Sequence, residues 1–489
     1  MASEPKLARM MGEGVVSEAS GAREGEQVLP GTVQVHNTLP TAVGLKEAQY
    51  EWINPVQGLQ QTGLVHFKWA SSGNKWLDVH NTFVYIVYRI VGPDGNPIVT
   101  RGAPVDGGPG PYRAQASVLP INGLAATMFS QVKVEINRQV VDSGGNNMYA
   151  HQSDLEMRLG YAKDAKEGHL SLSGFSEETA AFDDIPVVEL PFEQAEGGDP
   201  LPDAQLLPMM RRFRRTAGSK RNVVIGRIHS PIFEQPKYFP PGIEVRVSFD
   251  RKPDKFLLLT KRDDLYRLVI DEFKLLTRTV DSEDALKDDV QRVSFAGNSL
   301  VYPLRRVKME TYTVTAGNYH LGNPHILENE AEMPRRIFVG VLNHEAFFGH
   351  YKKDPFNYQH LNISKVGLRI GGSERLWPSF DGIDFGPNSN MYALPLLGLL
   401  QATNKLLGDE ELGIDMDNYR HRNCIFGFDL TSLSLPPGMC YEEGESLKKI
   451  ELVLNMSRAT TESVEVVIYA EYDAELHLRN GKVVMNDDA

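Results

Sequence analysis

The chain has 489 residues, a formal net charge of −13 and two cysteines. An acidic balance of this size argues against a protein that coats nucleic acid with its whole surface. No apolar run approaches the roughly 18 residues needed to cross a membrane, and the N-terminus lacks the apolar core of a signal peptide. We therefore expect a protein without a transmembrane segment, made in the cytosol or nucleus.

Strands are expected through most of the chain from Gly63 onward. The segment 243–250 alternates apolar and polar residues with the period of a half-buried strand. The segment 82–91 is apolar on both faces and should be a central strand. Further strands are expected at 64–70, 131–141, 221–226 and 266–280, and then at 302–314, 336–343, 365–370, around 423, around 450 and at 463–478.

Three blocks of sequence occur twice in the same order, about two hundred residues apart. They are SQVKVEI at 130–136 with SKVGLRI at 364–370, NMYA at 147–150 and 390–393, and RNVVIG at 221–226 with RNCIFG at 422–427. Each NMYA precedes a leucine-rich segment that could form a helix, at 155–161 and 394–400. Collinear blocks indicate one unit of roughly two hundred residues that is present twice.

About eight strands in each unit, joined by loops of uneven length, favour a jelly roll over an up-and-down barrel or a seven-stranded immunoglobulin-like sandwich. The predicted fold is all-β, with two tandem eight-stranded jelly rolls and short helices in the loops.

The composition shifts predict where these units begin and end. We expect a flexible N-terminal arm at 1–40, a first jelly roll at 41–280, a linker at 281–299, a second jelly roll at 300–480 and a tail at 481–489. The first jelly roll should carry a long surface loop at 92–111 and an insertion at about 168–208, which is rich in proline and acid.

No convergent catalytic set is visible. The string HEAFFGH at 344–350 lacks the second histidine that a helical zinc pair needs at position 348, and its neighbours favour a loop. There is no His-x-His pair, nucleophile elbow or phosphate loop. We therefore predict no catalytic, cofactor-binding or metal-binding residues, no cofactor and no enzymatic activity.

Two further features are open to interpretation. The basic cluster Arg211–Arg215 with Lys220 and Arg221 could be a nuclear import signal, a patch for nucleic acid or an acidic partner, or a solvated loop end. Cys424 lies inside an apolar strand run, which favours a buried free thiol over a disulfide with Cys440.

Four strings resemble the major capsid proteins of Polinton (Maverick) elements and their adintovirus relatives. They are RRTAGS at 214–219, IGRIHS at 225–230, DPFN at 354–357 and VIYAEY at 467–472. The resemblance extends from about Gly63 to Leu478. It does not include the loop at 92–111 or the insertion at 168–208.

The resemblance implies a double jelly-roll capsid protein that forms homotrimers, whose six jelly rolls make a pseudo-hexagonal capsomer. Such capsomers tile an icosahedral shell around double-stranded DNA. The implied partners are other copies of the chain, a penton protein and minor capsid proteins, without sequence-specific binding of nucleic acid. The implied location is the virion, after synthesis in the host cytoplasm, with nuclear import for assembly left open.

Two alternatives remain from the sequence. The first is a carbohydrate-binding or carbohydrate-cleaving protein built on two β-sandwiches, although the chain has only four tryptophans to line a sugar groove (Trp52, Trp69, Trp76 and Trp377). The second is a minor vertex or receptor-binding virion protein.

Overall fold

The computed structural model describes most of the chain from Gly44 onward. The described ranges are 44–59, 63–71, 73–98, 118–143, 147–178, 207–260, 265–295, 298–330, 332–371, 380–406, 410–431, 449–479 and 482–485. The predicted arm at 1–40, most of the loop at 92–111, most of the insertion at 168–208, and Cys440 lie outside the described residues. Within the part described, Leu45 to the C-terminus forms one unit.

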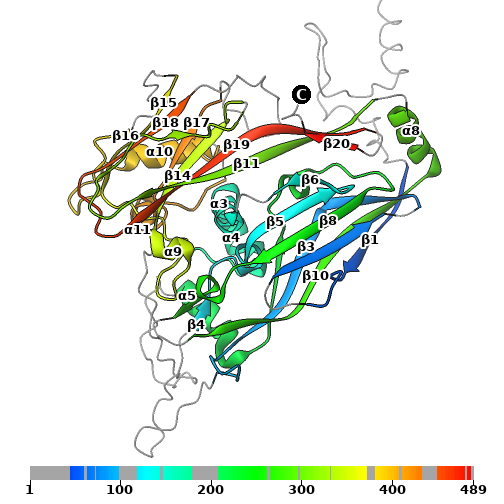
Figure 1. Ribbon diagram of the computed structural model, residues 1–489, viewed down its shortest axis with the longest axis horizontal. Coiled ribbons are helices and arrows are strands. Elements are labelled where there is room, and N and C mark those ends of the chain that lie inside the picture. The colour runs from blue at the N-terminus through cyan, green and yellow to red at the C-terminus, as the bar shows by residue number, and fades with distance from the viewer. Residues whose placement is uncertain are drawn as a thin grey trace, which may run out of the picture. The chain divides into compact units, whose positions relative to one another are not determined.

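The first half of this unit is a sandwich of two antiparallel four-stranded sheets (Figure 1). One sheet has the order β1-β10-β3-β7 and the other the order β2-β8-β5-β6. The strands are β1 (Leu45–Ile53), β2 (Leu64–Ala70), β3 (Lys75–Val91), β5 (Phe129–Ile136), β6 (Gln139–Asp142), β7 (Asn222–Arg227), β8 (Glu244–Arg251) and β10 (Arg267–Ser282). A separate pair joins β4 (Val118–Pro120) to β9 (Leu258–Thr260).

The second half is a sandwich of the same kind. Its sheets have the orders β11-β19-β14-β17, with β20 also on β19, and β12-β18-β15-β16, with β13 also on β18. The strands are β11 (Leu300–Val314), β12 (His320–Leu321), β13 (His325–Ile326), β14 (Arg336–Asn343), β15 (Ile363–Ile370), β16 (Phe380–Asp381), β17 (Ile425–Asp429), β18 (Ile450–Met456), β19 (Val464–Arg479) and β20 (Lys482–Met485).

The two sandwiches have the same strand order. With the short strands β12 and β13 counted as one interrupted strand, each has one sheet in the order first-eighth-third-sixth and one in the order second-seventh-fourth-fifth. This arrangement is a jelly roll, and the predicted fold of two tandem jelly rolls is confirmed. The long strand predicted to be central, β3, lies between β10 and β7.

Short helices occupy the connections between strands. In the first jelly roll they are α2 (Leu124–Thr127), α3 (Tyr149–Gly160), α4 (Lys163–Glu167), η4 (His169–Ser173), α5 (Leu207–Thr216), η6 (Ala217–Ser219), α6 (Pro231–Glu234) and α7 (Asp254–Leu257). In the second they are α9 (His344–Phe348), α10 (Ala393–Ala402) and α11 (Met416–His421). Both leucine-rich segments predicted to be helical are found in helices, α3 and α10.

Alternating strands place one apolar row of each sheet between the two layers. In the first jelly roll, Phe67 and Phe249 of one sheet meet Phe273 of the other, with ring centroids 4.8 and 5.1 Å from that of Phe273. All three rings are at most 3% exposed. Burying one such side chain contributes about 1.5–3 kcal/mol, so these rows hold the layers together.

The repeated blocks lie on equivalent elements, with one correction. The SQVKVEI and SKVGLRI blocks fall on the fourth strands, β5 and β15, and the NMYA blocks run into the first residues of α3 and α10. The RN blocks fall on the sixth strands, β7 and β17, but their glycines face opposite sides. Gly226 contacts Ala125 of the first core, whereas Phe426 and Phe428 point to the opposite sheet, so Gly427 between them faces α10. The sequence match between the two RN blocks is therefore shifted by one residue relative to the structural equivalence of β7 and β17. A shift of one residue moves every side chain of a strand to the opposite face of the sheet.

The strand predicted at 131–141 is instead the hairpin β5–β6. Asn137 and Arg138 have φ values of 49° and 68°, as a two-residue hairpin turn of type I′ requires, and Arg138 is an uncommon residue there.

The segments predicted to be a linker and a C-terminal tail contain regular structure. Helix α8 (Asp284–Phe295) fills most of the predicted linker at 281–299. Within the predicted tail, β20 pairs with the end of β19, and the Val483 backbone N–H donates to Oε1 of Gln139 at 2.6 Å. The long strand β19 offers an edge for β20, and the end of the second jelly roll is thereby connected to the first.

Candidate functional site: the junction between the jelly rolls

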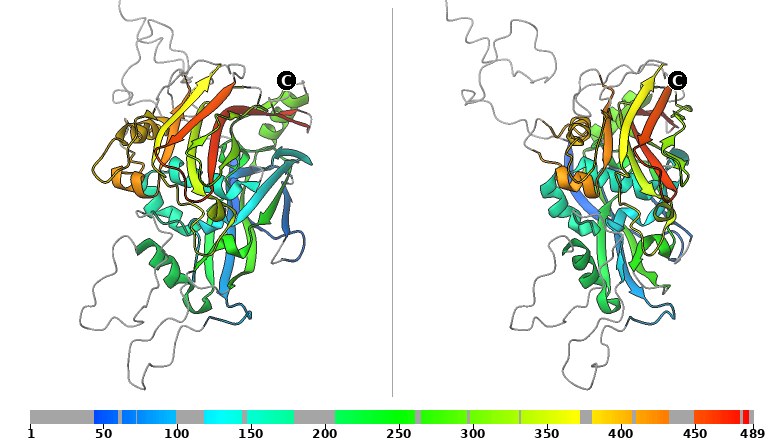
Figure 2. Two further views of the ribbon diagram at one scale, coloured as in Figure 1. Left: turned by 60° about the vertical axis from the view of Figure 1, so that its left-hand side comes forward. Right: turned by 90° about the vertical axis from the view of Figure 1, so that its left-hand side faces the viewer.

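Helix α3 is one of the elements through which the first jelly roll meets the second (Figures 1 and 2). Its residues from Tyr149 to Leu159 are all buried, although about half of them are polar. Leu155 and Leu159 pack within the core of the second jelly roll, in the same cluster as Phe338. Polar residues can be buried around such a helix only where they find partners. Those of α3 find partners within the helix, at His229 of the first jelly roll and at Asn423 of the second.

Arg158 of α3 makes the first set of these contacts. Its Nη2 and Nε atoms donate to the two carboxylate oxygens of Asp154 at 3.0 and 3.1 Å. Its Nη1 atom donates to Oδ1 of Asn423 in the second jelly roll, and its guanidinium lies 5.7 Å from the ring centroid of Tyr358. The side chains of Arg158 and Asp154 are 1% and 0% exposed.

Arg422 makes the second set of these contacts, from the second jelly roll toward the first. It lies in the second jelly roll and pairs with Asp354 of that jelly roll and with Glu178 of the first. Glu178 also pairs with Arg212, which donates to the carbonyl oxygen of Pro120 at 3.0 Å. Together with Arg158 and Asp154, three guanidinium groups balance three carboxylates in the interior.

The pKa values within this network follow from burial and pairing. Burial raises the pKa of Asp154 above its usual range, although Arg158 partly offsets this. Burial would also raise the pKa of Asp354, but the charges of Arg422 and Arg212 outweigh it and lower that pKa. Removing one partner would leave its opposite charge buried and unpaired, which typically costs about 3–5 kcal/mol.

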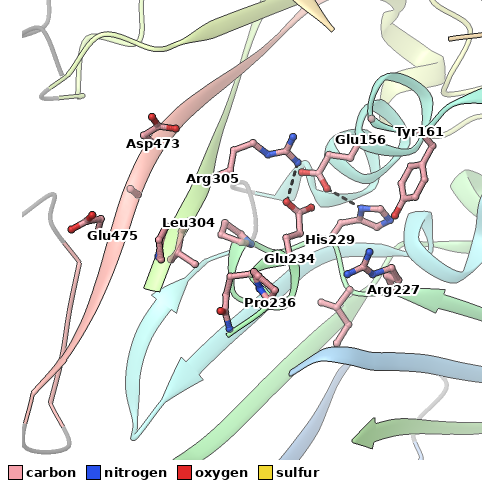
Figure 3. Close-up of a pocket in the computed structure, with 16 residues that line it drawn as sticks. Glu156, Tyr161, Arg227, His229, Glu234, Pro236, Leu304, Arg305, Asp473 and Glu475 are labelled. Carbon is pink, nitrogen blue, oxygen red and sulfur yellow. Dashed lines mark hydrogen bonds and ion pairs between the residues drawn. The ribbon is translucent and has the colours of Figure 1, made fainter. Parts of the chain in front are cut away.

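A cavity of about 590 Å³ lies beside this network, with walls from both jelly rolls (Figure 3). Glu156, His229 and Glu234 come from the first jelly roll and Arg305 from the second, and their side chains point toward one another. Nδ1 of His229 lies 2.9 Å from Oε2 of Glu156. Arg305 pairs with Glu234 at 2.9 Å and with Glu471 at 3.2 Å, so it bridges the two jelly rolls.

The two carboxylates of the first jelly roll differ in acidity. Burial would raise the pKa of Glu156, but the hydrogen bond and charge of His229 outweigh it and lower that pKa. Burial raises the pKa of Glu234 to about 7, against the opposing charge of Arg305. Glu234 therefore takes up a proton more readily than Glu156 as the pH falls.

These three side chains could also serve as ligands for a metal ion. Glu156, His229 and Glu234 each offer one atom, all within 4.8 Å of one another, and they form the one such group among the described residues. Arg305 already supplies a positive charge to Glu234. The arrangement therefore acts as an ionic clamp between the jelly rolls, in which the guanidinium occupies the place that a cation would take.

The sequence did not single out this clamp. Its members lie on α3, on the β7–α6 connection, on α6 and on β11, and their spacing matches no known ligand or catalytic pattern. One indirect signal existed, because the IGRIHS and DPFN strings both lie at the junction: the first contains His229 and the second begins at Asp354.

The histidine string at 344–350 is not the predicted loop but begins with the short helix α9. The side chain of Asn343 caps this helix, accepting from the backbone N–H groups of Glu345 and Ala346 at 3.0 and 3.3 Å. Nδ1 of His344 lies 2.6 Å from Oε1 of Glu465. The string belongs to no metal-ligating group in the part of the chain that the structure describes.

The basic cluster does not form one surface patch. Residues 207–216 form α5, where Arg212 is buried in the ionic network while Arg211 and Arg215 are exposed. Arg221 pairs with Asp271 at 3.1 Å and with Glu272 at 3.5 Å, both on β10 of the same jelly roll. The interpretation as a solvated loop end is therefore wrong for Arg212, which lies in a helix, is buried and is paired with Glu178. A guanidinium is rarely buried without such a partner.

Cys424 is a buried free thiol, as predicted, and burial raises the pKa of its thiol well above the usual value. Among the described residues, no helix combines the length and the apolar character that crossing a bilayer requires.

The strand order and the paired sandwiches define the chain as a double jelly roll. Solved structures with similar folds come from viruses. A chain of the Sputnik virophage matches with a TM-score of 0.59 and 13% identity, covering 94% of this chain and 92% of that one. A chain of the PBCV-1 virus capsid matches with a TM-score of 0.53 and 8% identity, over 92% and 98%. The Faustovirus major capsid protein matches with a TM-score of 0.50 and 9% identity, over 92% of each.

At the level of sequence, an uncharacterized protein of Caenorhabditis elegans is 21% identical over 451 residues. The match covers 91% of this chain and 96% of that protein. No protein-family model matches the chain. At these identities the likeness to the viral chains shows a common fold, and it extends over nearly the full length of both partners.

Proposed function

We propose that this protein is a major capsid protein, a structural component of a virion without catalytic activity. The observation that carries the proposal is the shared strand order of the two jelly rolls, together with the full-length fold match to the Sputnik, PBCV-1 and Faustovirus chains. A chain with two similar units lets three copies imitate sixfold symmetry. The proposed assembly is a homotrimer with a pseudo-hexagonal outline, which tiles an icosahedral shell around double-stranded DNA.

The ionic junction supports a structural role. Its charged groups pair with one another across the two jelly rolls, as Arg305 does with Glu234 and Arg422 does with Glu178. A fixed angle between the jelly rolls is what a tile needs if each of three chains is to contribute one third of a closed ring. The four strings that resemble Polinton and adintovirus capsid proteins favour that type of element as the source.

The domain boundaries of this proposal follow the sequence. The first jelly roll extends over 41–280, the segment 281–299 connects it to the second at 300–480, and the arm at 1–40 is available to contact neighbours. The proposed partners are further copies of the chain, a penton protein and minor capsid proteins. The proposed location is the virion, after synthesis in the host cytoplasm and with import into the nucleus as a possible stage of assembly.

Light scattering coupled to size-exclusion chromatography tests the assembly. The purified chain should elute as a particle of three times 54.6 kDa. Electron microscopy of the same sample should show particles or sheets with hexagonal outlines. A stable monomer at micromolar concentration would refute the proposal.

A further inference from the structure

Cations of the first jelly roll gather where β3 ends and β7 begins. Arg89 near the end of β3 and Arg221 just before β7 have side chains that are 44% and 60% exposed, and both pair with Asp271 of β10, at 3.4 and 3.1 Å. Arg221 also pairs with Glu272 at 3.5 Å, and Glu272 pairs with Lys274 at 3.1 Å. The three cations therefore share only the carboxylates of Asp271 and Glu272.

The segment before β7 adds further cations at this place. Arg215 and Lys220 are exposed, and their carbonyl oxygens accept from Nδ2 of Asn222, the first residue of β7, at 2.6 and 3.1 Å. Arg211 is also exposed and lies one turn before Arg215 on α5, so their side chains share a face of the helix. Within the described ranges, no carboxylate forms an ion pair with Arg211, Arg215 or Lys220.

Together these side chains form what we call the basic patch, which consists of Arg89, Arg211, Arg215, Lys220, Arg221 and Lys274. The string at 211–221 makes such a patch only together with the sheet, because Arg212 within it is buried. Two paired carboxylates, and the exposed Asp94 in the turn after β3, are too few to balance the patch. Positive charge that collects locally, in a chain of net charge −13, attracts an anionic partner.

Hydrogen bonds fix the backbone beneath the patch. Oγ of Ser219 donates to the carbonyl oxygen of Ile90 at 2.5 Å and accepts from the backbone N–H of Ile98 at 2.8 Å, which joins η6 to the end of β3. Asn222 joins the end of α5 to β7 in the same way. Because the backbone is already ordered, less conformational freedom is lost when a ligand binds.

We propose that the basic patch binds a sulfated polysaccharide. Arginine supplies most of the patch, and its planar fork binds the paired oxygens of an anionic group. A polysaccharide chain is thin enough to follow the patch from α5 to β10 without meeting the acidic surface of the rest of the chain. Double-stranded DNA is a broad rod with about one negative charge per 1.7 Å, and it would meet that acidic surface as well.

Fluorescence anisotropy of a fluorescein-labelled heparin oligosaccharide, titrated with the full chain, tests the site. The unmodified protein should bind, and its affinity should fall steeply between about 50 and 200 mM salt, because salt ions compete for each ion pair. Arg215→Glu with Lys220→Glu should weaken binding by roughly tenfold or more, since two attractions become repulsions. Unchanged affinity in this double variant would overturn the proposal.

Lys237→Glu with Arg458→Glu is the matched control, because both side chains are exposed and lie outside the patch. It changes the net charge equally, but salt screens charges beyond about 10 Å, so its affinity should stay within about twofold of the unmodified protein. An equal loss in the control would mean that net charge alone governs binding, and it would overturn the site.

Further measurements distinguish other partners. Duplex DNA and polyglutamate, labelled in the same way, should bind more weakly than the heparin oligosaccharide, and tighter binding of either would overturn the assignment. Circular dichroism and light scattering should show that both double variants are folded and keep the oligomeric state of the unmodified protein. Loss of self-association in the patch variant alone would make the patch a subunit contact and overturn the proposal. The capsid function is tested by light scattering, so it stands or fails independently of heparin binding.

Discussion

Acidification should weaken the junction through His151, and His151→Phe should remove this effect. The imidazole of His151 is buried between the jelly rolls, stacked on Phe347 with a centroid distance of 4.4 Å and edge-on to Phe256 and Phe356 at 5.6 Å. Burial, and secondarily the charge of Lys252, lowers the pKa of His151 well below 6.5. The imidazole is therefore neutral in the folded protein across the range in which it becomes charged in the unfolded chain.

The direction of this pH effect on stability follows from proton linkage. Below about pH 6.5 the unfolded chain binds a proton at this histidine and the folded protein does not, so stability is lost as the pH falls. Because the folded pKa lies well below 6.5, the loss between pH 7 and pH 5 approaches about 2 kcal/mol. At pH 7 the effect is nearly absent.

Urea denaturation, followed by tryptophan fluorescence at pH 7 and pH 5 and at one protein concentration, measures the effect. The His151→Phe variant should lose about 2 kcal/mol less than the unmodified protein between the two pH values. The exposed His320, replaced by Gln, provides the matched surface control in the same titration. Equal losses in the unmodified protein and in His151→Phe would refute the linkage argument.

Two further predictions concern packing and charge. Arg158→Met leaves Asp154 buried without its partner and should lower the free energy of unfolding by about 3–5 kcal/mol. Adding Asp154→Asn should recover part of this stability in the same urea titration. A double variant as unstable as the single one would contradict the pairing. Gly340→Ala places a Cβ 2.5 Å from the Tyr358 ring and should lower the free energy of unfolding by about 1–3 kcal/mol. Gly322→Ala, whose Cβ would have nothing within 4 Å, should leave it nearly unchanged. Equal urea midpoints for the two variants would show that the ring can move aside.

The local patterns of the sequence predicted the strands well and the connections less well. Alternation over 243–250 and apolar runs such as 336–343 depend only on which side of a sheet each residue faces, so β8 and β14 were found with nearly the observed bounds. The hairpin at Asn137 and Arg138 was missed because its turn uses a residue pair without glycine. Helix α9 was missed because its cap, Asn343, was assigned to the end of the strand at 336–343 and the following residues were interpreted as a loop.

The sequence by itself determined that one strand pattern is present twice, since periodicity and collinear repeats survive in a single chain whatever its partners. Only the tertiary structure decided how the two copies meet. Arg158 reaches Asn423 across 265 residues, and Arg305 reaches Glu234 across 71. Contacts of this kind depend on distances in space, which no local pattern records. For the same reason the burial of Arg212 became visible only once the sheets and helices were in place.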